Sequence, residues 1–293
     1  MDRTGTAGSV EVLGFPPDAR VLIVNADDFG MYGAINTGAL QSIEDGIVGS
    51  CSLMVPCPGA SEAMELLRRK PEIAFGIHLT LVCELTTARW GPMAAAKDSV
   101  PSLLDEAGEL FGPDRIPELL ARARLDDVGR EFRAQIDAVV GIGLEPTHLD
   151  WHCLADAGRP DVFDLTVALA DEYGLAVRAW GDRARTTLRR RGLPVVDHDF
   201  VDSFGLDLEG KAARYAALLR HLPVGLTEWA VHPGLDDEQA RAIDPGGWPV
   251  RHGDHGFLTS PEARAIVAEE GIAVIGYREV QRAWTRARVR PTG

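Results

Sequence analysis

Short apolar runs along this chain alternate with longer segments in which apolar residues recur at helical spacing. The first run, residues 21–24, shows no alternation of polar and apolar positions, which is typical of a strand buried on both faces. Ile35, Ala39 and Ile43 follow at helical spacing, and Gly46 is placed to end that helix. A strand followed by a helix is the repeating unit of a parallel sheet whose strands are joined by helical crossovers.

The alternation continues through the chain and predicts seven or eight strands. Further strands are expected at residues 52–55, 73–77, 147–149, 175–177, 195–196, 229–231 and 273–275. Helices are expected near residues 63–67, 119–139, 163–170, 210–219 and 261–270. We therefore predict an α/β fold: a single (β/α) barrel, TIM-like, with seven or eight parallel strands and room for distortion.

The length of the chain favours one domain. At 293 residues, with 45% hydrophobic and 25% charged residues, the chain can bury one large core. An α/β barrel commonly uses about 250 residues. We expect a single catalytic domain over residues 19–286, with flexible termini at 1–18 and 287–293. Two smaller domains are the alternative.

The charge balance bears on the partners of the protein. A net charge of −14 disfavours general binding to nucleic-acid phosphates, which rewards clustered Lys and Arg, so we expect no nucleic-acid partner. One local basic run, residues 182–191, could meet an anionic group on a substrate, although a solvated loop beside a helix is the favoured interpretation. A neutral small molecule fits this composition better.

Cysteine usage and the amino-terminal sequence favour a cytoplasmic location. Cys51, Cys57, Cys83 and Cys153 form no C-x-x-C pair and are expected to be reduced thiols. Residues 1–19 lack the basic start and apolar core of a secretory signal. No apolar run approaches the roughly 20 residues needed to cross a bilayer, so we expect no membrane span.

Ionisable side chains directly follow several of the expected strands. They are Asp27 and Asp28, His78, His148, Asp150 and His152, Arg178, and His232. Because the carboxyl ends of barrel strands converge on one face, we expect these side chains to share a rim. Each has a plainer interpretation: Asp27 and Asp28 could cap the next helix, and a single His after a strand is more often structural. Their combination favours one site.

Two imidazoles and one carboxylate can bind a divalent ion while leaving positions open for water and substrate. Asp150, which stands between His148 and His152, could orient an imidazole through its second nitrogen. We expect Cys153 to serve in packing, because neighbours on an extended chain point apart. The stretch 84–113 is longer than ordinary connections and is a candidate substrate loop.

Four strings carry a family resemblance. They read N-A-D-D-F-G at residues 25–30, G-I-H-L-T at 76–80, T-H-L-D-W-H at 147–152 and H-P-G at 232–234. In their order and approximate spacing, which extend over residues 21–277, the sequence resembles the YdjC-like (ChbG/HpnK) family of carbohydrate deacetylases.

The resemblance implies a role for each matching residue. Asp27 would be the catalytic base, His232 the acid that protonates the leaving amine, and Arg178 a residue that fixes the charge or direction of Asp27, with support from Asp150 and His148. Asp28, His78 and His152 would bind one divalent metal ion. Zinc or magnesium is favoured, with manganese, cobalt or nickel as alternatives. The substrate would be a small N-acetylated sugar, and a homo-oligomer is an open alternative to a monomer.

The sequence also departs from the family. Many members continue the third string as H-x-D-x-H-x-H-x-H, whereas Leu154 and Asp156 stand at the later positions here. Substrate choice is therefore less transferable than reaction type. Two other functions stay open: another metal-dependent hydrolase such as a phosphoesterase, and a non-catalytic sugar-binding protein. Trp90, Trp151 and Trp180 could stack on sugar faces or pack in the core.

Overall fold

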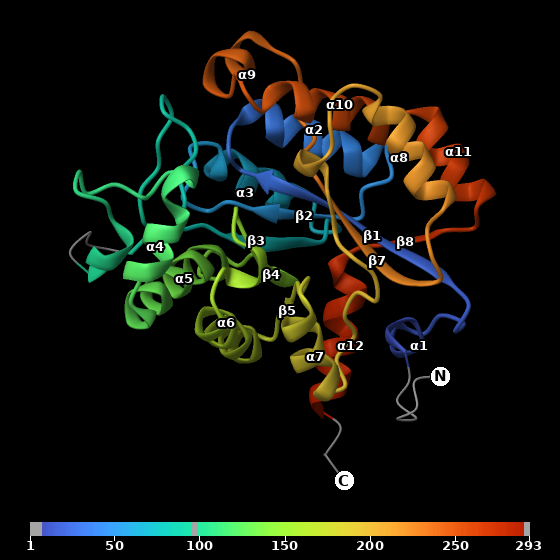
Figure 1. The fold of residues 1–293 in the computed structure, drawn as a ribbon, viewed down its shortest axis with the longest axis horizontal. Coiled ribbons are helices and arrows are strands. Elements are labelled where there is room, and N and C mark those ends of the chain that lie inside the picture. Colours follow the sequence, from blue (N-terminus) through green and yellow to red (C-terminus); the bar gives the residue numbers. More distant parts are fainter. Residues whose placement is uncertain (1–7, 95–98, 290–293) are drawn as a thin grey trace.

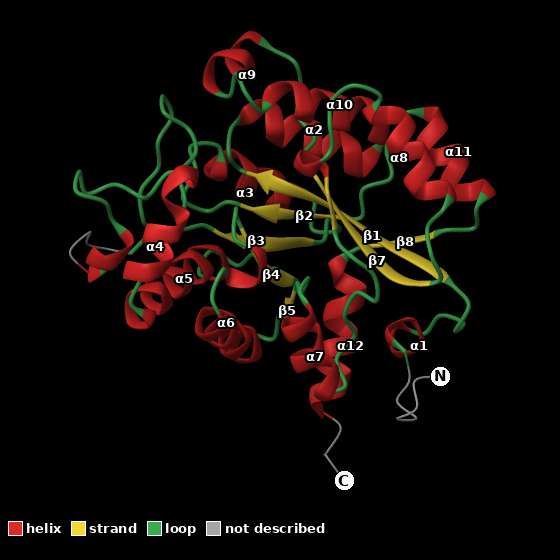
Figure 2. Cartoon of the chain, in the orientation of Figure 1, coloured by secondary structure: helices red, strands yellow, loops and turns green. Residues whose placement is uncertain are grey.

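The computed structural model describes residues 8–94 and 99–289, and it is built on one parallel sheet. Figures 1 and 2 show the sheet with helices on either side of it. The strands are β1 (Arg20–Phe29), β2 (Ser50–Leu53), β3 (Phe75–Leu79), β4 (His148–Trp151), β5 (Ala176–Val177), β6 (Val201–Asp202), β7 (Gly225–Val231) and β8 (Ala273–Ile275). Their order is β5-β4-β3-β2-β1-β7-β6, with β8 paired to β1.

Strand β1 is the centre of the sheet. One edge pairs with β7 from Arg20 to Ala26. The other edge is shared, because β8 pairs with its first half at Val21–Ile23 and β2 pairs with its second half from Asn25 to Phe29. Among the described residues no pairing joins β5 to β6, so the barrel is incompletely closed. The predicted α/β fold with parallel strands is confirmed, in a distorted form.

The helices cover the sheet and carry the apolar periodicity seen in the sequence. They are α1 (Ser9–Leu13), α2 (Gly33–Glu44), α3 (Ala60–Arg69), α4 (Ile116–Arg122), α5 (Leu125–Val140), α6 (Pro160–Tyr173), α7 (Asp182–Arg190), α8 (Lys211–Arg220), α9 (Glu238–Ile243), α10 (Trp248–Leu258), α11 (Pro261–Glu269) and α12 (Tyr277–Val289). On α5, Phe132, Ile136 and Val139 are buried at helical spacing. In the described residues no helix has the length and apolar character needed to cross a membrane.

Several expected elements differ from those observed. Residues 195–196 are not a strand; they lie in a buried loop, where Val195 exchanges hydrogen bonds with the hydroxyl of Ser9, and the strand follows at Val201–Asp202. The expected solvated loop at 182–191 is instead mostly helix α7. The strands also continue through the polar residues expected to follow them, so that His78 lies within β3.

The ordered structure extends past the expected domain limits of 19 and 286. Helix α1 lies in the segment expected to be a flexible terminus, yet its Val10 is 4% exposed because it packs into the core. Helix α12 runs to Val289, and its Trp284 is fully buried. Residues 1–7 and 290–293 lie outside the described part of the chain.

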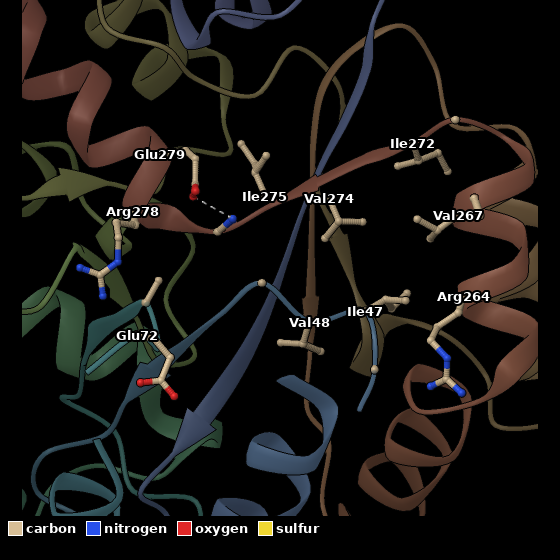
Figure 3. A pocket seen from close by; sticks show the side chains of 16 residues that line it. Ile47, Val48, Glu72, Arg264, Val267, Ile272, Val274, Ile275, Arg278 and Glu279 are labelled. Atoms are coloured by element: carbon tan, nitrogen blue, oxygen red, sulfur yellow. Dashed lines mark hydrogen bonds between the residues drawn. The ribbon is translucent and has the colours of Figure 1, made fainter. Parts of the chain in front are cut away.

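A cavity of about 640 Å³ lies beside β8 (Figure 3). It lies where the chain enters β2 and β3, at the amino ends of these strands, and its lining includes none of the ionisable residues singled out in the sequence, all of which are described. Arg278 on its wall donates hydrogen bonds to the backbone carbonyls of Pro71 and Ile73. This cavity is therefore separate from the rim where chemistry was expected.

Candidate active site

A local irregularity at the end of β1 brings two adjacent aspartates into one cavity. In a regular strand Asp27 and Asp28 would point to opposite faces. The pairing of β1 with β2 shifts register between Ala26 and Phe29, and Asp28 adopts a left-handed backbone with φ 64°. Aspartate tolerates this conformation better than most residues. The resulting bulge re-aims the side chains, so both line a cavity of about 470 Å³.

The same cavity collects three of the other six predicted site residues, whereas Arg178, Asp150 and His148 do not line it. His78, His152 and His232 line it together with the two aspartates. They come from the carboxyl-terminal ends of β1, β3, β4 and β7 or directly after them. The expected convergence on one rim is thus observed for these five residues.

Asp28, His78 and His152 form a group of potential metal ligands, which we name the ligand group. Oδ1 of Asp28 lies 3.4 Å from Nε2 of His78 and 3.1 Å from Nδ1 of His152. The three donor atoms are within 4.8 Å of one another, and all three residues are buried. Nδ1 of His78 lies 2.9 Å from Oδ1 of Asp150, which directs Nε2 toward Asp28. A buried carboxylate and two converging imidazoles fit a divalent ion.

The surroundings of the two imidazoles are strongly anionic. Burial alone would lower the pKa of His78, but Asp150, Asp28 and Asp27 raise it to about 9. Burial is likewise outweighed at His152, where the neighbouring Cys153, Glu84 and Asp28 raise the pKa above its ordinary value. Both groups therefore lie where positive charge is favoured, as a cation-binding site requires.

Asp27 has a different set of partners. Its two oxygens each accept a hydrogen bond of 2.8 Å from the guanidinium of Arg178, and Oδ1 also accepts one of 2.7 Å from the side chain of Asn25. Burial raises the pKa of Asp27, but the charge and hydrogen bonds of Arg178 hold it below its ordinary value. Asp27 is thus kept ionised with a fixed orientation.

Arg178 contacts two buried carboxylates besides Asp27. Its Nε donates to Oε1 of Glu228 at 2.9 Å, and its Nη1 lies 3.0 Å from Oδ2 of Asp150. Burial raises the pKa of Glu228 to about 7, despite the neighbouring Arg178 and a hydrogen bond from the hydroxyl of Tyr277. Three buried carboxylates, those of Asp27, Asp150 and Glu228, share one guanidinium.

His232 directly follows β7 and is fixed at two points. Its backbone N–H donates to Oδ2 of Asp254 at 2.8 Å, and its Nδ1 lies 2.7 Å from the hydroxyl of Ser203. The ring of Phe204 packs edge-on against it, with centroids 4.6 Å apart. Engagement of Nδ1 leaves Nε2 as the nitrogen that can meet a substrate atom.

His148, which was expected among the substrate-binding or supporting residues, does not line the cavity. Its ring stacks on Tyr277, with centroids 3.6 Å apart, and a Cβ on Gly76 would come within 2.4 Å of that ring. Burial lowers the pKa of His148, which disfavours the charged form of the ring. Nε2 of His148 lies 3.2 Å from the hydroxyl of Ser52 and 3.5 Å from Oδ2 of Asp150, so His148 supports these two residues.

The chain is similar in sequence to known proteins over most of its length. The family model described as YdjC-like protein matches residues 21–269, which is most of the chain. The chain belongs to the YdjC-like family. A carbohydrate deacetylase from Geobacillus stearothermophilus is 36% identical over 261 residues, covering 89% of this chain and 98% of that protein. A carbohydrate deacetylase from Thermus thermophilus is 33% identical, covering 85% and 90%.

A solved structure is also similar to this YdjC-like protein. It is the crystal structure of an Enterococcus faecalis protein described as a cellobiose-phosphate cleavage protein. The two share a TM-score of 0.74 and 26% identity, over 88% of this chain and 98% of that one. The predicted family resemblance is therefore confirmed along nearly the whole length of its relatives.

Several residues at the site were not anticipated from the sequence, among them Arg251 and Glu84. Nη1 of Arg251, on α10, lies 2.8 Å from Oδ2 of Asp28. Glu84, which begins the long stretch expected to be a substrate loop, places Oε2 2.8 Å from Nε2 of His152. The prediction that Cys153 serves in packing is wrong, because its φ of 58° breaks the extended chain and leaves the side chain exposed at the cavity. No motif marked Arg251, whereas the long loop was a signal for Glu84.

The departures from the YdjC-like pattern have distinct positions. Leu154 lines the cavity, whereas the carboxylate of Asp156 accepts hydrogen bonds from the backbone N–H groups of Trp180 and Gly181 and so fixes the loop before α7. Trp151 and Trp180 line the cavity. The indole of Trp151 packs against Phe163 and donates a hydrogen bond to Thr166, so Trp180 and Phe204 are the residues that offer aromatic rings to this cavity.

Proposed function

We propose that this YdjC-like protein is a metal-dependent hydrolase that removes the N-acetyl group from an amino sugar or N-acetylated saccharide and releases acetate. The observation that carries the proposal is the convergence, in one cavity, of the ligand group, the clamped carboxylate of Asp27 and the imidazole of His232. The carbohydrate deacetylases similar to this chain support the substrate class.

Asp28, His78 and His152 would hold the ion. When bound, a divalent ion supplies Lewis-acid chemistry, polarising an amide carbonyl and making a water molecule more acidic. Arg251 would keep one oxygen of Asp28 engaged, so that the other faces the imidazoles.

The protein's own groups account for the proton transfers of amide hydrolysis. Asp27, held ionised by Arg178, accepts a proton from the attacking water. The C–N bond of the tetrahedral intermediate breaks only if nitrogen leaves as an amine, which requires a proton. His232 supplies that proton from Nε2, because Ser203 engages Nδ1. The products are acetate and the free amino sugar.

The phosphoesterase alternative has no support in the arrangement of charges. Several arginines of the basic run on α7 pair with carboxylates of neighbouring segments, as in Arg183 with Asp164 at 3.2 Å and Arg191 with Asp171 at 2.7 Å. This run contributes no residue to the cavity lining. Among the described residues, the guanidinium that lines the cavity is that of Arg251, which is paired with Asp28 and Asp244, so a phosphate group would lack a free guanidinium there.

The assigned base is tested with Asp27→Asn. We expect acetate release from N-acetylated saccharides to fall about 10²- to 10⁴-fold, the usual contribution of a general base, while metal content is retained. Release that persists at the wild-type rate would remove Asp27 from this role. An aryl phosphate serves as the control substrate, and phosphate release without acetate release would favour the other hydrolase.

The ligand group is tested separately with His78→Ala. Elemental analysis should show lower metal content together with lower turnover, because one of three donors is lost. Retention of stoichiometric metal would contradict the ligand assignment while leaving the role of Asp27 intact.

A further inference from the structure

The imidazole of His152 has donor groups on both of its sides. Nδ1 faces Asp28 at 3.1 Å. On the opposite side, Nε2 lies 2.8 Å from Oε2 of Glu84 and 3.3 Å from Sγ of Cys153. Glu84, His152 and Cys153 therefore form a second group of potential ligands, with donor atoms within 4.8 Å of one another.

We propose that Glu84, Cys153 and Nε2 of His152 form a second metal site, selective for a thiophilic divalent ion such as zinc, beside the site of the proposed hydrolysis. A carboxylate, an imidazole and a thiolate are a donor set that zinc accepts, whereas magnesium prefers oxygen ligands. Three protein donors would leave a position open toward the cavity.

The backbone conformation brings these donors close together. An extended chain would turn Cys153 away from its neighbour His152, but the left-handed conformation of Cys153 turns Sγ toward Nε2. Glu84 is held at the base of its loop, where the preceding residue Cys83 donates a backbone hydrogen bond to Phe111 and Val82 bridges to the same residue. Both flanking donors are thus anchored by main-chain geometry.

Access from solvent also distinguishes this group. Cys153 is the exposed cysteine, whereas Cys51, Cys57 and Cys83 are buried. The side chain of Glu84 is 22% exposed, and both residues line the cavity that holds Asp27. An ion can therefore reach the second site through the same opening as the substrate.

Because both groups share His152, the two sites are coupled. An ion bound to Nε2 would share the imidazole that the first group uses through Nδ1. The ion would also lie among residues that line the substrate cavity. Zinc in excess of one equivalent should therefore inhibit turnover. This expectation goes beyond the proposed function, and the site itself can be tested without any turnover.

Cobalt is the probe, because a cobalt–thiolate bond gives a charge-transfer absorption that carboxylate and imidazole ligands do not. Cobalt titrated anaerobically into the metal-free, full-length protein should produce this band, and zinc should displace it. Asp28→Asn should retain the band, since Asp28 is not one of the donors of the second group. Cys153→Ser should abolish it, and Glu84→Gln should weaken cobalt binding at least about tenfold, the lower end of the loss seen when even an outer partner of a metal site is removed.

Cys83→Ser is the matched control, because this buried thiol lies near Glu84 in sequence but is directed to the carbonyl of Leu85. It should retain the band. A wild-type protein that binds cobalt without the band, or a band that survives Cys153→Ser, would overturn the second site and leave the first untouched. If acetate release is observed, inhibition by excess zinc should be lost in Cys153→Ser; equal inhibition of both proteins would refute the coupling.

Discussion

Replacement of Glu228 by Gln gives a sharp test of the buried charge network behind Asp27. Glu228 is 1% exposed, and its carboxylate accepts hydrogen bonds from Nε of Arg178 and from the hydroxyl of Tyr277. The guanidinium must also compensate Asp27 and Asp150, so the network holds three acids and one cation. A neutral amide of the same shape removes one charge without emptying the space.

The magnitude follows from the pKa of Glu228. Burial raises this pKa from 4.5 to about 7, so the folded protein takes up a proton that the unfolded chain has released. A rise of this size corresponds to about 3 kcal/mol. For a carboxyl with a raised pKa, the contribution to stability is complete below the unfolded value of 4.5 and is lost as pH rises through 7. The stability of wild type relative to Glu228→Gln should therefore fall by about 3 kcal/mol between pH 4.5 and pH 8.

Urea unfolding followed by circular dichroism, over this pH range and in a chelating buffer, measures the difference. Glu269→Gln, on the exposed surface of α11, is the control for loss of a carboxylate without burial. A difference in stability between wild type and Glu228→Gln that is the same at every pH would contradict the raised pKa of Glu228. An equal dependence on pH in the Glu269→Gln control would contradict it as well.

Two further changes test how neighbouring residues position the site. Gly76→Ala should destabilise the protein by about 1–3 kcal/mol, seen as a lower melting temperature, because the added Cβ meets the buried ring of His148; Gly256→Ala, where nothing lies within 4 Å, should not destabilise it. Ser203→Ala removes the partner of Nδ1 on His232, so kcat for acetate release should fall about tenfold with little change in KM. A change in KM alone would assign Ser203 to substrate binding.

Much of the fold and the site could be predicted because both follow from local patterns. Buried strands give unbroken apolar runs, and the carboxyl ends of parallel strands must converge, so Asp28, His78 and His152 could be placed together without coordinates. The strand predicted at 195–196 is a buried loop, and the sequence could not distinguish the two, since a hydrogen bond from Ser9, 186 residues away, satisfies the backbone carbonyl of Val195. Periodicity contains no signal for such a contact.

The residues that the sequence did not reveal share one property: they act through partners distant in the chain. Arg251 reaches Asp28 from α10, and Glu84 reaches His152 from a loop. Neither belongs to a periodic pattern, and an arginine or glutamate on a loop or helix is ordinarily solvated. Only the fold shows that these charges are directed inward.

Asp27 and Asp28 show most clearly why residue type and spacing are insufficient to assign chemistry. The two are identical and adjacent, yet one is clamped by Arg178 and the other faces two imidazoles. In a regular strand their side chains would point to opposite faces of the sheet, and one of them would not reach the cavity. The register shift in β1 and the left-handed backbone of Asp28 keep both in place. Different roles for the pair therefore depend on one local break in strand geometry, which a regular pattern of polar and apolar residues cannot encode.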